Sequence, residues 1–313
     1  MRVLVTGANG FIGRALCVYL RSKGHELVSV VRSKPQDGQI TVGEIGPAVN
    51  WNMALHGCDA VVHLAARAHV LRDASVNSLG TYRTVNCDGT LNLARQAASV
   101  GVRRFVFISS IGVNGSQKAF PGFTEADEPN PQDPYSISKY DAEMGLREIA
   151  KRTGMEVVIL RPPLVYGPCA PGNFRILVNV IRKGIPLPLG AVHNQRSFVA
   201  VDNLVDFIAL CVDRMRSPLA ANELFLISDG EDVSTTELLR KVALAYGVKA
   251  FLLPIPVMWM RFAARCLGKG AMANRLLGSL VVDSSKAREL LGWRPLVSMD
   301  GQLKKMALHD SCI

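Results

Sequence analysis

Short apolar runs alternate with amphipathic segments through the first half of the chain. Five runs rich in Val, Ile and Phe have the length of buried strands and cover residues 2–6, 26–31, 60–64, 104–109 and 156–160. Between them, apolar residues recur at helical spacing over residues 13–23, 84–99 and 135–151. This order predicts βαβ units and a doubly wound parallel sheet in an α/β protein.

The pattern loosens after residue 165. Prolines at positions 168, 171, 186 and 188 interrupt shorter elements, and we expect helices over residues 203–213 and 235–246. The chain therefore divides into a larger domain over residues 1–165 and a smaller C-terminal lobe over residues 166–313, which we expect mainly to bind the substrate.

Residues 251–282 are apolar but carry Arg261, Arg265, Lys269 and Arg275. We favour a helix that caps the C-terminal lobe, since such helices are common in soluble α/β proteins. The alternative is an amphipathic helix that lies on a membrane surface.

Composition narrows the class of protein. Mean hydropathy is +0.19 and no apolar run is long enough to cross a bilayer, so we expect no integral membrane segment. The N-terminus enters a strand without the features of a secretory signal, which favours a cytoplasmic protein. Seven scattered cysteines without metal-ligand spacing indicate reduced thiols and no metal. The net charge is +10, but the basic residues are spread along the chain and no nucleic-acid motif appears, which favours small anionic ligands over nucleic acid.

A glycine-rich turn connects the first strand to the first helix. Gly7 permits a tight turn, Gly10 lets backbone N–H groups approach a pyrophosphate, and Gly13 lets the helix pack on the strand. Asn9, Phe11 and Ile12 lie in the same turn and are expected to contact the cofactor. The strand, turn and helix in succession predict a Rossmann-like dinucleotide-binding domain.

The second strand is followed by Arg32 and Lys34, where an NAD-binding unit usually has an acidic residue for the ribose. A guanidinium or ammonium suits a 2′-phosphate, so we predict NADP(H). The alternative is NAD(H) bound beside an exposed basic loop.

Tyr135 and Lys139 are four residues apart at the start of a predicted helix and so share one face. A nearby ammonium and a cationic cofactor would lower the pKa of the phenol and make it an acid–base catalyst. Alone, this spacing commonly marks a solvated helix face. Together with the glycine turn it favours catalysis.

Five further motifs bear on the family: His63-Leu64-Ala65-Ala66, Asn86-Cys87-Asp88-Gly89-Thr90, Ser109-Ser110-Ile111-Gly112-Val113, Arg161-Pro162-Pro163-Leu164-Val165-Tyr166-Gly167-Pro168 and Arg196-Ser197-Phe198-Val199-Ala200-Val201-Asp202. With the glycine turn and the Tyr135/Lys139 pair, the chain resembles the extended short-chain dehydrogenase/reductases over nearly its whole length. This family includes UDP-galactose 4-epimerase and nucleotide-sugar dehydratases and reductases.

The resemblance assigns roles to individual residues. Ser110 would hydrogen-bond the reacting oxygen; a strand-end cap is the structural alternative. Where the family usually has Val-Tyr-Gly after this serine, the chain has Val113-Asn114-Gly115, so we expect the sugar pocket to differ there. The remaining assignments are cofactor contacts by Leu64, Ala65, Ala66, Pro162 and Val165, adenine contacts by Glu44 and Ile45, and UDP-sugar contacts by Asn173, Leu187 and Arg196.

Within the family, the chain is most similar to bacterial reductases of UDP-linked 4-keto-6-deoxy-N-acetylhexosamines in O-antigen and capsule synthesis. This similarity rests partly on the run Ala65-Ala66-Arg67-Ala68-His69-Val70. We therefore expect NADP(H)-dependent reduction of the C4 ketone. The alternatives are an NAD-dependent UDP-hexose or UDP-N-acetylhexosamine 4-epimerase and a non-catalytic dinucleotide sensor. The resemblance also implies a homodimer that pairs through residues 84–99 and 135–151.

Overall fold

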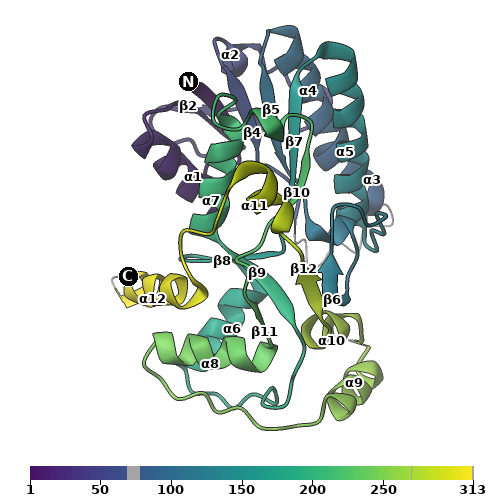
Figure 1. Cartoon of the computed structure of the whole chain (residues 1–313), viewed down its shortest axis with the longest axis vertical. Coiled ribbons are helices and arrows are strands. Elements are labelled where there is room, and N and C mark those ends of the chain that lie inside the picture. Colours follow the sequence, from purple (N-terminus) through teal and green to yellow (C-terminus); the bar gives the residue numbers. More distant parts are fainter. Residues whose placement is uncertain (69–77, 269, 312–313) are drawn as a thin grey trace.

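The computed structural model describes residues 1–68, 78–268 and 270–311 (Figure 1). His69 and Val70 of the run quoted above, Lys269 and Cys312 lie outside the described residues.

The larger part of the molecule is built on a seven-stranded parallel sheet. Its strand order is β10-β7-β5-β4-β1-β2-β3, and every neighbouring pair is parallel. The strands are β1 (Arg2–Thr6), β2 (Glu26–Val31), β3 (Gln39–Thr41), β4 (Ala60–His63), β5 (Arg104–Ile108), β7 (Glu156–Arg161) and β10 (Leu224–Leu226). The predicted α/β class is confirmed, and the five predicted strands agree with the structure to within one residue at each end.

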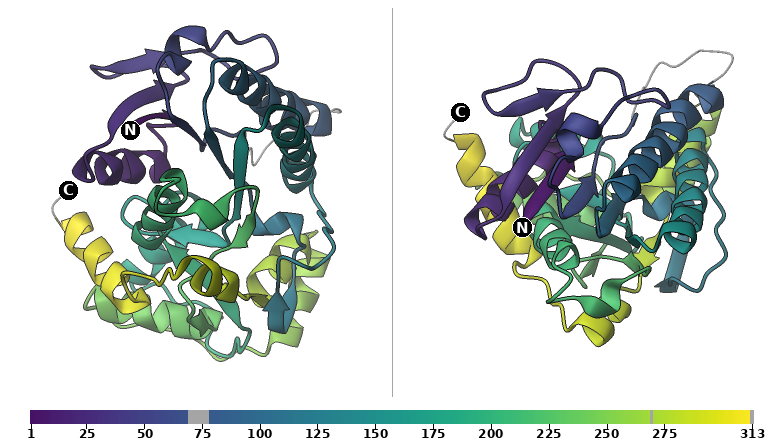
Figure 2. Two further views of the ribbon diagram at one scale, coloured as in Figure 1. Left: turned by 45° about the horizontal axis from the view of Figure 1, so that its top comes forward. Right: turned by 90° about the horizontal axis from the view of Figure 1, so that it is seen from above.

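Helices cover both faces of this sheet because alternate strand residues point to opposite sides (Figure 2). Val3 and Val5 pack in one apolar core, whereas Leu4 packs in another. The first core contains α1 (Phe11–Ser22), α7 (Val201–Val212) and α11 (Ser285–Leu291), and the second contains α2 (Asn52–Leu55), α4 (Gly89–Ser99) and α5 (Pro134–Thr153). The doubly wound, Rossmann-like architecture is therefore as predicted.

The helix predicted over residues 84–99 has a more complex form. Residues 84–99 form a π-helical turn η1 (Thr84–Asp88) and α4, and the additional helix α3 (Ser78–Arg83) directly precedes them. A π-helical turn is rare and inserts an additional residue into the helical repeat. Hydrophobic periodicity predicts the helical segment but contains no signal for this local change.

A second, five-stranded sheet forms the core of the C-terminal lobe. Its order is β11-β9-β12-β6, and β8 pairs separately with β9. Its strands are β6 (Lys118–Phe123), β8 (Leu164–Tyr166), β9 (Arg196–Ala200), β11 (Asp232–Val233) and β12 (Leu280–Val282). Around it lie α6 (Gly172–Arg182), α8 (Thr235–Ala245), α10 (Gly270–Leu277) and α12 (Met299–Ser311), whereas Ala220 of the short 3₁₀ turn η3 (Pro218–Ala220) packs in the first core of the large sheet.

The chain crosses between the two parts more than once. Strand β6 precedes residue 165 but belongs to the second sheet, whereas α7 and β10 follow it and belong to the first part. The division of function at residue 165 stays a prediction.

The apolar, basic stretch over residues 251–282 forms α9 (Val257–Cys266), α10 and β12. As expected for a capping helix, Val257 and Met260 pack against the core of the C-terminal lobe, yet no residue of α9 is buried. Among the described residues, no helix is long and apolar enough to span a membrane.

Candidate active site

The turn between β1 and α1 has the geometry that the glycines predict. Gly7 has a left-handed φ of 67°, and a Cβ atom at Gly13 would lie 2.1 Å from the Gly7 carbonyl oxygen. Gly10 caps α1 without a side-chain hydrogen bond, and the Arg14 N–H is bonded to the Gly10 carbonyl at 3.0 Å. The preceding N–H groups lie at the positive end of a helix dipole. This turn fits the pyrophosphate of a dinucleotide.

The segment after β4 closes against this turn. A Cβ at Gly7 would lie 3.0 Å from the Ala65 nitrogen and 3.4 Å from the Leu64 carbonyl carbon. The Ala65 N–H also donates to the Thr6 hydroxyl at 3.2 Å. The structure thus brings Leu64 and Ala65 beside the glycine turn, and Ala66 follows them directly.

His63 is buried at the end of β4 and is held by two threonines. Thr90 donates its hydroxyl proton to the Asn86 carbonyl, so it accepts from Nε2 of His63 at 2.9 Å. Nδ1 then accepts from the Thr6 hydroxyl at 2.8 Å. Burial and the nearby Lys139 ammonium lower the pKa of His63 to about 3. His63 is a neutral hydrogen-bonding residue here, not a proton carrier.

Arg32 follows β2 and lies 3.6 Å from the Glu44 carboxylate, and both side chains are exposed. Such a pair is weak in water, so the guanidinium is available to another anion. Lys34, two residues on, has a left-handed φ of 53° and is exposed. Ile45 packs against α4, where a Cβ at Gly89 would be 2.6 Å from its Cγ2. The predicted ribose and adenine residues therefore share one edge of the sheet.

Lys139 lies in a buried position on α5. Its ammonium donates to the Ile108 carbonyl at 2.8 Å, lies 4.5 Å from the Phe107 ring centroid, and is 5.9 Å from the Tyr135 ring centroid. Burial lowers the pKa of Lys139 to about 7, against the opposing effect of the Glu143 carboxylate. The predicted face shared by Tyr135 and Lys139 is present at the end of β5.

Tyr135 is half-buried, and its ring contacts Tyr82 edge-on with 6.3 Å between centroids. Burial and the Asp133 carboxylate raise the pKa of Tyr135, opposite to the lowering that the sequence analysis predicts. Desolvation disfavours phenolate, and Lys139 directs its ammonium to a carbonyl instead of to the phenol. The protein's own groups therefore keep Tyr135 protonated and able to donate.

Ser110 has an extended backbone and begins the 3₁₀ turn η2 (Ile111–Val113). Its hydroxyl oxygen accepts from the Gly112 N–H at 3.1 Å. The structural role as a cap is therefore present. It is also compatible with catalysis, because a hydroxyl that accepts from the backbone still has its proton to donate.

A buried polar network supports this site and was not predicted. Glu143, one turn after Lys139, accepts from Arg161 at 2.9 and 2.5 Å and from the Ser109 hydroxyl at 2.5 Å. Arg161 also donates to the Asn114 side chain at 2.8 Å. Asn114 is buried in this network, so the departure from Val-Tyr-Gly alters a hydrogen bond beneath the site. Only the spacing from Lys139 to Glu143 could have pointed to it.

A second missed residue is Asn86, which lies in the π-helical turn and is buried. Its side-chain amide accepts from the Arg67 N–H at 2.8 Å and donates to the Ser138 hydroxyl at 3.0 Å. It thereby ties the segment after β4 to the first turns of α5. The sequence motif contains Asn86 but does not indicate what it contacts.

The remaining cofactor residues lie beyond β7. The Pro162 carbonyl accepts from the Ile111 N–H at 3.0 Å, next to Ser110, and Val165 lies in β8. The segment that follows β7 therefore lies beside the end of β5, next to Ser110.

The predicted substrate residues lie in the C-terminal lobe. Arg196 opens β9 and donates to the carbonyls of Arg275 and Gly278 at 2.5 and 3.0 Å. Burial lowers the pKa of its guanidinium. Asn173 is exposed at the start of α6, and the Leu187 N–H donates to the Phe251 carbonyl at 2.9 Å.

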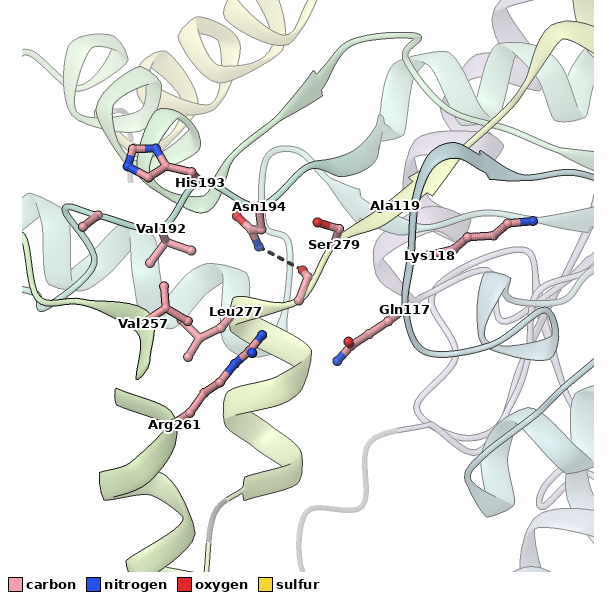
Figure 3. Close-up of a pocket in the computed structure, with 12 residues that line it drawn as sticks. Gln117, Lys118, Ala119, Val192, His193, Asn194, Val257, Arg261, Leu277 and Ser279 are labelled. Carbon is pink, nitrogen blue, oxygen red and sulfur yellow. Dashed lines mark hydrogen bonds between the residues drawn. The ribbon is translucent and has the colours of Figure 1, made fainter. Parts of the chain in front are cut away.

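A pocket of about 530 Å³ lies in the C-terminal lobe (Figure 3). Val257 and Arg261 of α9 form one side, Gln117 and Lys118 another, and Asn194 donates to the Gly278 carbonyl at its base. It shares Gly278 with Arg196 but includes none of the predicted substrate residues. Four distant segments form it, which explains why no sequence motif indicated it.

Grouped metal ligands are absent from the part of the chain that the structure describes: no three His, Cys, Asp or Glu side chains come together there.

The sequence and the fold are similar to those of known proteins. Residues 3–224 match the family described as NAD dependent epimerase/dehydratase. The chain belongs to this family. A relative named UDP-glucose 4-epimerase, from Vibrio cholerae, is 43% identical over 312 residues, which cover 97% of this chain and 94% of the relative.

Two further proteins are similar to this chain. An Escherichia coli O157:H7 protein named N-acetyl-alpha-D-glucosaminyl-diphospho-ditrans,octacis-undecaprenol 4-epimerase is 31% identical over 272 residues, covering 85% of this chain and 77% of the relative. The crystal structure of a Thermotoga maritima UDP-glucose 4-epimerase with UDP-glucose has a TM-score of 0.79 and 27% identity, covering 100% and 99% of the two chains. All three are named 4-epimerases.

Proposed function

We propose that the protein is an NAD-dependent 4-epimerase of a UDP-hexose or UDP-N-acetylhexosamine. The observation that carries the proposal is the 43% identity, over nearly the full length, to a protein named UDP-glucose 4-epimerase. The juxtaposition of Ser110, Tyr135 and Lys139 at the end of β5 supports acid–base chemistry on a sugar hydroxyl. The preference among sequence-based hypotheses is thereby reversed, since the 4-reductase ranked first there.

The dinucleotide, when bound at the glycine turn, would supply reversible oxidation at sugar C4. Tyr135 would move the proton at the C4 oxygen, returning it in one half-reaction and removing it in the other, where the positive charge of an oxidised nicotinamide would favour the phenolate that the protein's own groups disfavour. Ser110 would orient that oxygen through its hydroxyl proton, and Lys139 would set the charge beside the phenol. Arg196 and Arg261 would hold the diphosphate, since both guanidinium groups lie at or beside the pocket.

A second candidate is NADP(H)-dependent reduction of a UDP-4-keto-6-deoxy-N-acetylhexosamine. The specific observation in its favour is Arg32, which is exposed at the end of β2 where an acidic residue would suit NAD. Its Glu44 partner is also exposed, so a 2′-phosphate could replace it. If the protein is instead a non-catalytic dinucleotide sensor, we expect neither 4-epimerisation nor reduction of the C4 ketone.

The two enzymes differ in how they use the cofactor. One sample of the purified protein is denatured, and the dinucleotide that it releases is identified by mass spectrometry. A second, intact sample is incubated with UDP-glucose or UDP-N-acetylglucosamine without added reductant. The epimerase proposal predicts bound NAD and 4-epimer formation. Consumption of NADPH with a UDP-4-keto-6-deoxy sugar, without epimerisation, would establish the reductase instead.

The product would supply surface polysaccharide synthesis, a setting suggested by the lipid-linked sugar in the name of the Escherichia coli relative.

The protein would form a homodimer through the adjoining helices α4 and α5, where Leu91 packs at Gly145 and Met144 is exposed. Light scattering after size-exclusion chromatography would test the mass, and Met144→Glu should shift it to that of a monomer.

A further inference from the structure

Positive charge is concentrated in one segment of the C-terminal lobe. Between Glu237 and Asp283 there is no acidic residue, but there are seven basic ones: Arg240, Lys241, Lys249, Arg261, Arg265, Lys269 and Arg275. Lys241 and Arg275 are in ion pairs, with Glu231 and Asp300 and with Asp133 respectively. Within the described residues, Arg261 and Arg265 of α9 have no ion-pair partner. Arg261 lines the pocket described above, and the charge of Arg265 is available to an anionic surface.

Helix α9 has an apolar side that faces away from the protein. Val257 and Met260 pack against the lobe, whereas Met258, Trp259 and Phe262 are 72%, 62% and 63% exposed. The helical repeat of 3.6 residues places these three on the side opposite the packed one. Figure 1 shows α9 at the outer edge of the lobe, beyond α10. Large apolar groups gathered on one exposed side mark an interaction surface.

The charged and apolar residues lie next to each other along this helix. Arg261 and Arg265 are four residues apart and form a stripe that flanks the apolar side. The apolar surface continues into the preceding segment, where Phe251, Leu253 and Ile255 are exposed. Trp and Phe on one side and Arg along its flank are typical of a helix that lies in a membrane interface.

We propose that α9 docks this protein on an anionic lipid bilayer, lying in the plane of the membrane. Met258, Trp259 and Phe262 would enter the boundary between headgroups and acyl chains, and Arg265 would contact lipid phosphates.

A bilayer explains the charge better than a second copy of the chain does. In a symmetric pair through α9 the arginine stripes of both copies would approach, and the segment over residues 238–282 has no acidic side chain to neutralise them. A helix at the outer edge of the lobe also suits a deformable surface. Because the inward side of α9 lines the pocket through Val257 and Arg261, docking would place the pocket beside the membrane.

The chain contains its own probe for this proposal. Of the three tryptophans, Trp51 and Trp293 are buried and only Trp259 is exposed. We would titrate the full chain with vesicles of phosphatidylcholine alone and with an equal share of phosphatidylglycerol. Anionic vesicles should shift the tryptophan emission to shorter wavelength and co-sediment the protein, and neutral ones should bind at least about 10-fold more weakly. Raising NaCl from about 0.1 to 0.5 M should weaken binding by a similar factor.

Matched variants locate the contact. Met258→Ser/Phe262→Ser should reduce binding to anionic vesicles at least about 10-fold, and Arg265→Glu should reduce it and its salt dependence. Met53→Ser/Met215→Ser removes side chains that are 89% and 90% exposed elsewhere and should bind like the parent. Circular dichroism and epimerase activity should be unchanged in all three, which separates docking from the proposed function.

Absence of vesicle binding by the parent would overturn the proposal, as would equal binding by the Met258→Ser/Phe262→Ser variant. A concentration-dependent dimer that this variant abolishes, without lipid binding, would assign the surface to a second copy instead.

Discussion

The ammonium of Lys139 donates a 2.8 Å hydrogen bond to the carbonyl of Ile108, the last residue of β5. This contact holds a buried cation at the end of the sheet while the Tyr135 ring lies 5.9 Å away. The placement has a measurable effect on stability because the site lowers the pKa of Lys139 to about 7.

Lys139→Met should change how the free energy of unfolding depends on pH. Between pH 7 and the ordinary lysine pKa, the unfolded chain binds a proton at Lys139 that the folded chain does not, so this residue makes stability rise with pH. The parent should gain up to about 1.4 kcal/mol per pH unit relative to the variant above pH 7, and nothing below it. Urea unfolding at several pH values measures this slope. The exposed Lys151→Met variant should parallel the parent; a Lys139→Met variant that also did so would contradict the buried, lowered pKa.

Tyr135→Phe should lower kcat by about 100-fold or more, because it removes the proton assigned to the sugar C4 oxygen while retaining the ring. Its contact with Tyr82 should persist, so dinucleotide content and the unfolding midpoint should stay close to those of the parent. Tyr140→Phe on the same helix is the control and should retain full activity. Turnover by Tyr135→Phe within a few-fold of the parent would exclude Tyr135 as the proton donor.

Arg32→Asp should shift the ratio of NADP(H) to NAD(H) affinity by roughly 10- to 150-fold toward NAD(H). The guanidinium that suits a 2′-phosphate is replaced by a carboxylate that repels it and accepts from the ribose hydroxyls. Calorimetric titration with both reduced cofactors measures the ratio. Arg103→Asp makes the same charge change at the opposite end of the sheet and should leave the ratio unaltered. An unchanged ratio in Arg32→Asp would remove Arg32 from the ribose site.

Arg196→Ala should raise the KM for UDP-sugar about 10-fold or more, since a charge-assisted contact to the diphosphate is lost. Dinucleotide content should remain that of the parent, because Arg196 lies in the C-terminal lobe, on β9. The exposed Arg175→Ala variant of α6 controls for the loss of one charge. Equal weakening of sugar nucleotide and dinucleotide would instead assign Arg196 to the stability of the lobe, through its bonds to Arg275 and Gly278.

Glu143→Gln should destabilise the fold by about 3–5 kcal/mol, because it leaves the buried Arg161 guanidinium without its counter-charge. Urea unfolding at neutral pH checks this. The same change at Glu148, whose pair with Arg152 is exposed, should cost no more than about 1 kcal/mol. Similar losses for both variants would show that the buried pair contributes no more than a surface pair.

The sequence predicted the large sheet well because each of its central strands is buried on both faces and reads as a continuous apolar run. It did not predict the second sheet, since β8 and β12 have three residues each, too few for a period to appear.

The tight turn at Gly7 and the shared face of Tyr135 and Lys139 could also be predicted, because both depend on spacing along the chain. The contact between Arg161 and Asn114 joins residues 47 positions apart. The sequence does not distinguish such polar residues from exposed ones. Their role becomes clear only when the structure shows that they are buried and hydrogen-bonded to each other.

The π-helical turn at Thr84–Asp88 makes the length of this segment as important as its residues. One additional residue rotates the helix before the turn by about 100° relative to the helix after it. That phase difference lets Tyr82 meet Tyr135 while Leu93 and Ala97 still face the sheet. Deleting one residue of this turn would leave most of the motif around Asn86 recognisable in the sequence. It would nevertheless turn Tyr82 away from the Tyr135 ring that it contacts.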